Sequence, residues 1–176
     1  MNKITIILVM IVLVLIGVYI YVQNNDAPVV YTNESNDYRI KVPQGWQATQ
    51  LNQGIIKGVV FSKVGDTDTI PAQILITKQV ITDFPGVENL EQWYQKGGIF
   101  EGSDFFIEKT EVTINDLEMS RIITQAEGSI GNILTYIYAT DEKTVIALSH
   151  FPYDKDSDSS KTFENLVQSF EIVALK

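Results

Sequence analysis

Residues 106–125, FIEKTEVTINDLEMSRIITQ, decide the fold, because they hold two β-type runs separated by only two residues. Asn115 and Asp116 both tolerate a positive φ, which is typical of a two-residue hairpin turn. So short a connection permits only antiparallel pairing. Phe106–Ile114 and Leu117–Gln125 are therefore predicted to be neighbouring strands of an antiparallel sheet.

The chain that follows this hairpin extends the pattern. Asn132–Thr140 and Thr144–Phe151 are two further β-rich runs, joined by the turn residues 141–143. The period then changes over Lys161–Phe170, where apolar residues recur at the i, i+3, i+4 and i+7 spacing of a helix. This spacing predicts a closing helix with one apolar stripe that packs on the sheet.

The chain that precedes the hairpin contributes strands and one helix. Tyr38, Ile40 and Val42 alternate with charged residues, as in a half-buried strand, and the run ends at Pro43. Further strands are predicted around residues 59–61 and at Ala72–Val80. A helix is expected from Glu88 to Lys96, where two glycines stop it. The order of elements indicates an α+β domain, an antiparallel β-sheet covered by helices.

Two segments resemble a known fold family. The opening run from Tyr38 to Trp46, with Tyr, Ile, Pro and Trp at set positions, is similar to the first strand of the PsbP/Mog1-like fold. Phe163–Phe170 resembles its closing helix, which often ends in Ser-Phe. The resemblance covers residues 37–173 and implies an α/β/α sandwich. Its known members are chiefly non-enzymatic, and the anchored bacterial envelope proteins among them are the nearest in organisation.

An uncharged apolar run, Ile4–Val22, precedes the domain. At about 1.5 Å per residue it matches a hydrocarbon core of about 30 Å, so a transmembrane helix is expected. Lys3 lies just before the run and no cation follows it until Arg39, so the positive-inside rule places the N-terminus in the cytoplasm. The prediction is a single-pass signal-anchor at 4–22 in the cell membrane, contacting the lipid bilayer.

A cleaved signal peptide is the main alternative to this anchor. The apolar run exceeds the usual length of about 7–15 residues and lacks a small-residue cleavage site, because Pro28 follows Ala27. Lipoprotein anchoring is excluded, since the chain has no cysteine. The predicted organisation is a cytoplasmic stub at 1–3, the anchor at 4–22, a tether at 23–36 and an extracytoplasmic domain at 37–176.

The charge of the chain limits its partners. The formal net charge is −9, with 22 acidic and 13 basic residues. An acidic domain repels phosphate backbones, so nucleic-acid binding is not expected. The same charge keeps an extracytoplasmic domain soluble.

No catalytic motif is present in the sequence. His150 is the only histidine, and it shares strand parity with Ile146 and Leu148, so a partly buried structural residue is expected. No Gly-x-Ser-x-Gly, phosphate loop or paired-histidine motif occurs. The prediction is a protein that is not an enzyme and needs no cofactor.

Asp154, Asp156 and Asp158 form the one group that could bind a metal. Carboxylates at alternate positions resemble the first half of a calcium loop. Ser159 stands where that loop needs glycine, and Asn165 where it needs a bidentate glutamate. The alternative interpretation is a solvated loop that caps the final helix.

Ile99 and Phe100 follow two adjacent glycines and form the candidate partner-binding loop. Trp46 and Trp93 could line a ligand groove, but core positions are favoured because such side chains bury a large area.

The sequence thus predicts an extracytoplasmic, non-enzymatic binding or assembly module that contacts an envelope protein. The alternatives are a calcium- or small-ligand-binding domain and, third, an envelope hydrolase with an unrecognised carboxylate site.

Overall fold

The structure is a computed structural model, and it describes residues 28–35, 37–53, 56–66, 68, 71–95, 106–125 and 131–173. The elements in chain order are β1 (Val29–Thr32), β2 (Tyr38–Val42), β3 (Trp46–Gln53), β4 (Ile56–Lys63), β5 (Gln73–Val80), the 3₁₀ turn η1 (Ile81–Asp83), α2 (Leu90–Gln95), β6 (Phe106–Ile114), β7 (Leu117–Gln125), β8 (Asn132–Ala139), β9 (Thr144–Tyr153), α3 (Asp158–Val167) and β10 (Glu171–Ile172).

The predicted hairpin is confirmed. β6 and β7 pair antiparallel with Ile114 opposite Leu117, and the two turn residues have φ values of 50° and 64°. The turn also contacts the end of the chain, because Asn115 Nδ2 donates to the carbonyl oxygens of Gln168 and Phe170 at 2.9 and 3.0 Å. One asparagine therefore closes the hairpin and fixes the segment that follows α3.

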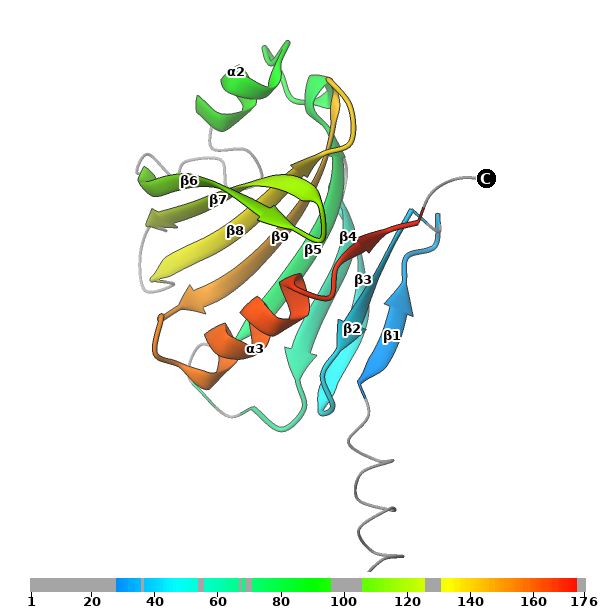
Figure 1. The fold of residues 1–176 in the computed structure, drawn as a ribbon, viewed down its shortest axis with the longest axis vertical. Helices are drawn as coiled ribbons and strands as arrows, with labels where there is room; N and C mark the ends of the chain where they lie inside the picture. The colour runs from blue at the N-terminus through cyan, green and yellow to red at the C-terminus, as the bar shows by residue number, and fades with distance from the viewer. Residues whose placement is uncertain are drawn as a thin grey trace, which may run out of the picture.

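Most of the described strands form one seven-stranded antiparallel sheet in the order β3-β4-β5-β9-β8-β7-β6 (Figure 1). β9 lies at its centre and joins the two halves, pairing with β5 on one side and β8 on the other. The strand predicted around residues 59–61 is β4. The run Trp46–Gln53, which the sequence did not identify as a strand, is β3 and forms one edge of this sheet.

A second, three-stranded sheet has the order β1-β2-β10. Its strand β1 corrects the predicted tether, because Val29–Thr32 pair with β2 and so belong to the folded domain. β10 brings the end of the described chain back to β2, where Arg39 and Glu171 form an exposed ion pair at 2.6 Å. The small sheet thus combines both ends of the domain.

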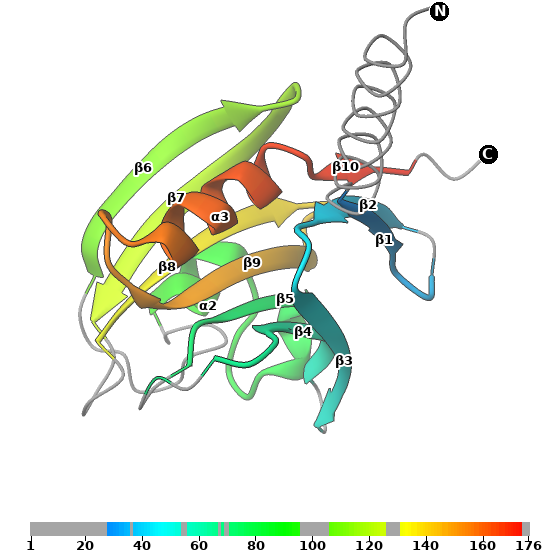
Figure 2. The ribbon, with the colours of Figure 1, turned by 90° about the horizontal axis from the view of Figure 1, so that it is seen from below.

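The described helices α2 and α3 cover opposite faces of the large sheet (Figure 2). The larger core lies under α3, where Phe163, Leu166, Val167 and Phe170 are almost completely buried against the sheet. A smaller core lies under α2 and contains Trp93 and Tyr94. The α3 helix begins at Asp158, three residues before the predicted start, because the side chain of Ser157 caps it by accepting from the Ser160 N–H. The fold is mostly antiparallel sheet with few helices. The described helices therefore cover less of each sheet face than the predicted α/β/α sandwich implies.

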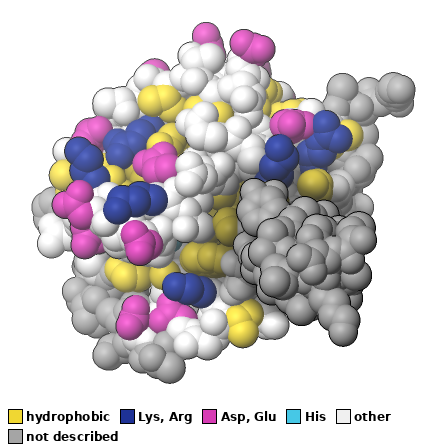
Figure 3. Space-filling view, turned by 60° about the horizontal axis from the view of Figure 1, so that its bottom comes forward, with side chains coloured by type: hydrophobic (Ala, Val, Ile, Leu, Met, Phe, Trp, Pro, Cys, Tyr) yellow, Lys and Arg dark blue, Asp and Glu magenta, His cyan; other side chains and the backbone are white. Residues whose placement is uncertain are grey.

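Charged side chains of both signs are interspersed on the face that carries α3 (Figure 3). Arg121, for example, pairs with Glu108 at 2.8 Å across β6 and β7. The predicted membrane segment, residues 4–22, lies outside the described residues. Within the described ranges, no helix is long and apolar enough to cross a bilayer.

Candidate binding groove

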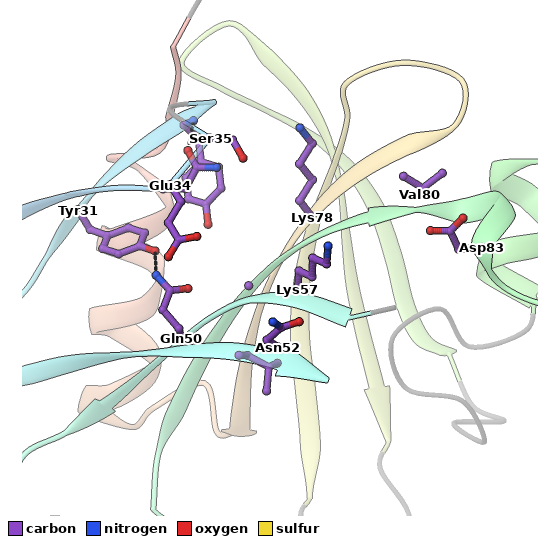
Figure 4. Close-up of a pocket in the computed structure, with 13 residues that line it drawn as sticks. Tyr31, Glu34, Ser35, Gln50, Asn52, Lys57, Lys78, Val80 and Asp83 are labelled. Atoms are coloured by element: carbon purple, nitrogen blue, oxygen red, sulfur yellow. Dashed lines mark hydrogen bonds between the residues drawn. The ribbon is translucent and has the colours of Figure 1, made fainter. Parts of the chain in front are cut away.

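A groove of about 520 Å³ lies between the small sheet and the β3–β5 end of the large sheet (Figure 4). Tyr31 on β1 forms one wall together with Asn33, Glu34 and Ser35, which follow the strand. Side chains of β3, β4 and β5 form the floor, and Asp83 of η1 lies at one end. The groove therefore exists because two separate sheets meet at an angle and do not continue each other.

The strand register explains why the floor is polar. One row of paired residues across β3, β4 and β5 consists of Gln50, Val59 and Ile76. Only its β3 member is polar. The next row toward the end of the strands is Asn52, Lys57 and Lys78. Side chains two residues apart on a strand share a face. Lys57 and Lys78 therefore lie on the same face as Val59 and Ile76 of the core under α3, and the polar groove begins where that core ends.

Two lysines face each other on this floor. Lys57 and Lys78 are directly opposed on neighbouring strands, an arrangement that destabilises a sheet when the charges are alike. Lys78 is compensated, because its Nζ lies 2.8 Å from Asp37 Oδ2. Lys57 has no ion-pair partner in the part of the chain that the structure describes. Among the described residues, therefore, an unpaired cation lines the groove beside a paired one.

Asn33 holds Asp37 in place for this ion pair. Its Oδ1 accepts from the backbone N–H groups of Asp37 and Tyr38 at 2.7 and 3.0 Å, and its Nδ2 donates to Asp37 Oδ2 at 3.3 Å. The asparagine side chain bridges the β1–β2 connection, bonding to residues four and five positions after it. The acceptor for Lys78 is thus positioned by a turn, with little freedom to move.

Tyr31 and Gln50 connect the two sheets across the groove. Gln50 Nε2 donates to the Tyr31 hydroxyl at 3.1 Å, as Figure 4 shows. The Tyr31 ring stands edge-on to Phe61, with centroids 5.3 Å apart, so its apolar body is anchored in the core under α3. This contact fixes the width of the groove at its β3 side.

The groove is equipped for hydrogen bonding and charge pairing. It presents amides, hydroxyls, two ammonium groups and the carboxylates of Glu34 and Asp83, and no histidine or cysteine lines it. Burial raises the pKa of Tyr38, and the neighbouring Tyr31 and Asp37 raise it further, so that phenol stays protonated. The arrangement can bind a polar chain or ligand.

His150 is a core residue. It is completely buried on β9, its ring stacks on Phe163 with centroids 5.4 Å apart, and its Nδ1 lies 3.0 Å from the Gln73 carbonyl oxygen. A carbonyl only accepts, so Nδ1 carries the proton and donates. Burial lowers the pKa of the imidazole, which is therefore neutral at pH 7. It lies deeper in the core than the sequence suggested.

Asp154, Asp156 and Asp158 are exposed around the start of α3. Asp154 accepts from the Asp156 N–H at 3.1 Å, and Asp158 lies 3.6 Å from Lys161 on the first turn of the helix. Across the described ranges, no three acidic or histidine side chains are placed to hold a metal ion. The geometry is that of a helix-capping loop, and calcium binding there stays a prediction.

The other predicted site residues differ in outcome. Ile99 and Phe100 lie outside the described residues, and their role in partner binding stays a prediction. Trp93 is a core residue beneath α2, and Trp46 packs partly buried against the core under α3. Neither tryptophan lines the groove.

Sequence reasoning missed the groove and its residues. Lys57 and Lys78 were visible as single charges within β-rich runs, but only the register brings them to one point. β3 was not predicted as a strand, because Trp46–Gln53 shows little apolar–polar alternation and contains three glutamines and an asparagine. Without β3, no sequence pattern indicated a groove beside it. A tyrosine and two asparagines around a turn, at 31–36, were the available hint.

Comparison with known proteins finds similar solved structures but no similar sequence family. No protein-family model matches the sequence, and no curated protein matches it. The solution structure of cyanobacterial PsbP (CyanoP) from Synechocystis sp. PCC 6803 is similar with a TM-score of 0.59 and 14% identity, over 84% of this chain and 94% of that one. A crystal structure from Bacteroides thetaiotaomicron is similar with a TM-score of 0.51 and 13% identity, over 85% of this chain and 49% of the other. The domain has a PsbP-like fold.

Proposed function

We propose that this protein is a membrane-anchored, extracytoplasmic binding or assembly module, which acts through protein–protein contacts at the cell envelope and catalyses no reaction. The membrane part of the proposal depends on the uncharged run Ile4–Val22 and on the lysine before it. The rest depends on the groove and on the chemistry of its walls.

The observation that carries the proposal is the polar groove between the two sheets. It offers hydrogen-bond donors and acceptors from six elements, together with one unpaired cation, Lys57, among the residues described. The two sheets hold these groups apart through Tyr31 and Gln50, so the site exists before any partner arrives. Such preformed polar concavities favour binding because little ordering is needed.

A second candidate function is the binding of a small polar ligand. The groove volume of about 520 Å³ falls within the range of about 300–1,000 Å³ found for ligand pockets. Ligand pockets are mostly apolar, however, whereas this floor is lined by Asn52, Lys57 and Lys78. The polar lining favours a protein segment with its own backbone hydrogen bonds.

Co-purification from the native host tests the proposal. Full-length protein is solubilised from membranes in mild detergent and compared with a variant that carries only residues 1–36. We expect a stoichiometric protein partner that is retained by the full chain and lost from the short variant. The full chain should also resist extraction from membranes by alkaline carbonate.

Two outcomes would contradict the proposal. Recovery of the full chain in the carbonate supernatant would remove the membrane anchor. Absence of any stoichiometric partner, together with thermal stabilisation of the full chain by small polar molecules, would favour the second candidate function.

A further inference from the structure

The four outer strands of the two sheets differ in how their unpaired edges are protected. β1 and β10 have only four and two residues. β6 carries Glu108, Lys109 and Glu111, and its pairing with β7 is interrupted by an irregularity near Phe106. Shortness, charge and bulges are the usual means of preventing an edge from pairing with another chain.

β3 has none of these protections. Its eight residues, WQATQLNQ, contain no charge and no proline, and its pairing with β4 is regular from end to end. Residues 47–50 and Asn52 are exposed. Figure 2 shows β3 as the outermost strand on its side of the large sheet. A long, uncharged edge is a ready template for an added strand.

The register identifies which backbone groups are free. Val64 N donates to Gly45 O at 2.7 Å, so residue 45 is in a hydrogen-bonded pair with β4. Pairing alternates along an antiparallel strand, so Gln47, Thr49 and Leu51 also bond to β4, and Ala48, Gln50 and Asn52 point outward. No backbone partner for these three outward residues occurs in the described chain.

The charge around β3 differs from that of the whole protein. β3, β4 and β5 together contain Lys57, Lys63 and Lys78 and no carboxylate. The whole chain, in contrast, has 22 acidic and 13 basic residues. The charged residues of these three strands are therefore all basic, with Asp37, Glu34 and Asp83 of other elements lying next to them, and Lys57 is unpaired among the described residues.

We propose that β3 accepts an extended, acidic segment of a partner protein as an additional strand. The inference rests on the proposed function and names the class of partner for the same site. Ala48, Gln50 and Asn52 supply the main-chain hydrogen bonds, and their side chains lie on the face that opens into the groove (Figure 4). Main-chain bonds provide affinity in this mode, and alternate side chains provide specificity.

The acidic side chain of the segment is recognised by Lys57. An added strand would lie about 10 Å from β4, two strand spacings away, with side chains on the same face. The Lys57 side chain on β4 and a glutamate side chain on the added strand are together long enough to meet over Asn52, the shorter side chain between them. The carboxylates of Glu34 and Asp83 line the same groove from other elements, and Figure 4 draws Glu34 beside Tyr31 and Gln50.

A second copy of this chain is a poorer occupant of the edge. Pairing β3 with β3 of another copy would bring two basic sheet halves together, with three lysines and no carboxylate in each. Both copies would also carry the same net charge of −9. Like charges oppose such an encounter, whereas an acidic segment is attracted to the local lysines.

Amide hydrogen exchange measured by NMR on the full chain in detergent micelles tests the proposal. The probes are two capped decapeptides that alternate Thr and Val and differ only in one central residue, Glu or Lys. At ten times its Kd, the Glu peptide should slow exchange about tenfold at Ala48, Gln50 and Asn52. Gln47, Thr49 and Leu51 already bond to β4, so they provide an internal control and should change little.

Two pairs of variants separate backbone pairing from charge. Gln50→Pro and Gln50→Ala both lose the side-chain bond to Tyr31, but only Gln50→Pro also loses an outward N–H, and it does so without breaking the β3–β4 ladder. Gln50→Pro should therefore abolish the effect of the peptide, whereas Gln50→Ala should bind it more weakly and still show the alternation of protected amides. Lys57→Glu should weaken binding of the Glu peptide several-fold. Lys155→Glu, an equal change of charge in the exposed loop before α3, should not.

Three results would overturn the proposal: no alternation between outward and inward amides, equal protection in Gln50→Pro, or equal binding of both peptides. Protection that rises with protein concentration, without peptide, would assign the edge to a second copy and also overturn it. The peptides need no native partner, so this test is independent of co-purification. A native partner that Gln50→Pro still retains would leave the proposed function intact and refute the edge as its site.

Discussion

The two faces of the large sheet are built differently. The face under α3 is a closed apolar core in which Phe163, Leu166 and Val167 pack on Ile146 and Leu148 of the central strand. The face under α2 has the smaller core, formed around Trp93, Ile122, Val145 and Ala147. Alternate residues of the same strand, β9, therefore serve two cores of unequal size.

Polar burial separates the two faces further. Thr77 and Gln79 lie opposite Ala147 and Val145, so they share the α2 face, and both are almost completely buried. Gln79 Oε1 and Trp93 Nε1 are buried without a hydrogen-bond partner in the described structure. Each such atom costs about 1–3 kcal/mol. The α3 face also holds one such atom, His150 Nε2, but within the larger apolar core, so within the described chain the α2 face has the smaller core and the larger share of buried, unpartnered polar atoms.

The largest expected effect is on the α3 face. Phe163→Ala removes a completely buried ring that contacts Tyr136 and His150. We expect the free energy of unfolding to fall by about 3–5 kcal/mol, because the transfer term and the cavity term add. Urea denaturation of the full chain in detergent, followed by tryptophan fluorescence, measures this change.

Asn165→Ala is the matched control, since Asn165 is exposed on the same helix. It should change stability by less than about 0.5 kcal/mol. Comparable losses in the two variants would mean that α3 contributes through helix formation and not through its packed face.

A smaller effect is expected on the α2 face. Trp93→Phe deletes the buried, unpartnered Nε1 donor and some ring area, and these two changes oppose each other. The free energy of unfolding should change by about 1 kcal/mol or less, whereas Trp93→Ala should lower it by about 3 kcal/mol or more. Thermal unfolding of both variants measures the difference. A loss as large for Phe as for Ala would show that the indole nitrogen does have a partner.

The α3 face could be predicted from sequence because its signals are periodic. The stripe of Phe163, Leu166 and Val167, the Asn115-Asp116 turn and the strands on either side each depend on local spacing. The α2 face was less predictable, because Thr77 and Gln79 are polar residues within a strand and give no local sign of burial. Their burial results from which strands become neighbours, and local spacing does not determine that.

The groove escaped prediction for a related reason. β3 is an edge strand with one partner, so its residues are exposed on several sides and show neither apolar periodicity nor charge alternation. β1 was assigned to a tether because residues 23–36 are mostly polar and of turn type, and the four-residue strand Val29–Thr32 is too short to stand out among them. The candidate site is made from the elements with the weakest sequence signals, whereas the core elements have the strongest.

A pH-dependent effect, smaller than the loss expected for Trp93→Ala, concerns the one titratable imidazole within the apolar α3 face. Burial lowers the pKa of His150 below its ordinary value of 6.5, so the folded state prefers the neutral ring. Below pH 6.5 the unfolded chain binds a proton that the folded chain does not, and folding therefore loses stability as the pH falls. The loss continues until the pH passes the lower pKa of the folded state.

His150→Gln isolates this contribution, because it removes the titrating group and leaves the carboxylates unchanged. Between pH 7 and pH 5 the wild type should lose stability faster than the variant, by up to about 1.4 kcal/mol for each pH unit below 6.5. Urea denaturation at closely spaced pH values measures the two slopes. The variant will be less stable at pH 7, since the stack on Phe163 and the bond to Gln73 change, so the slopes and not the absolute values decide. Parallel curves would mean that water reaches Nε2 and that the α3 face is not the closed core that distinguishes it from the α2 face.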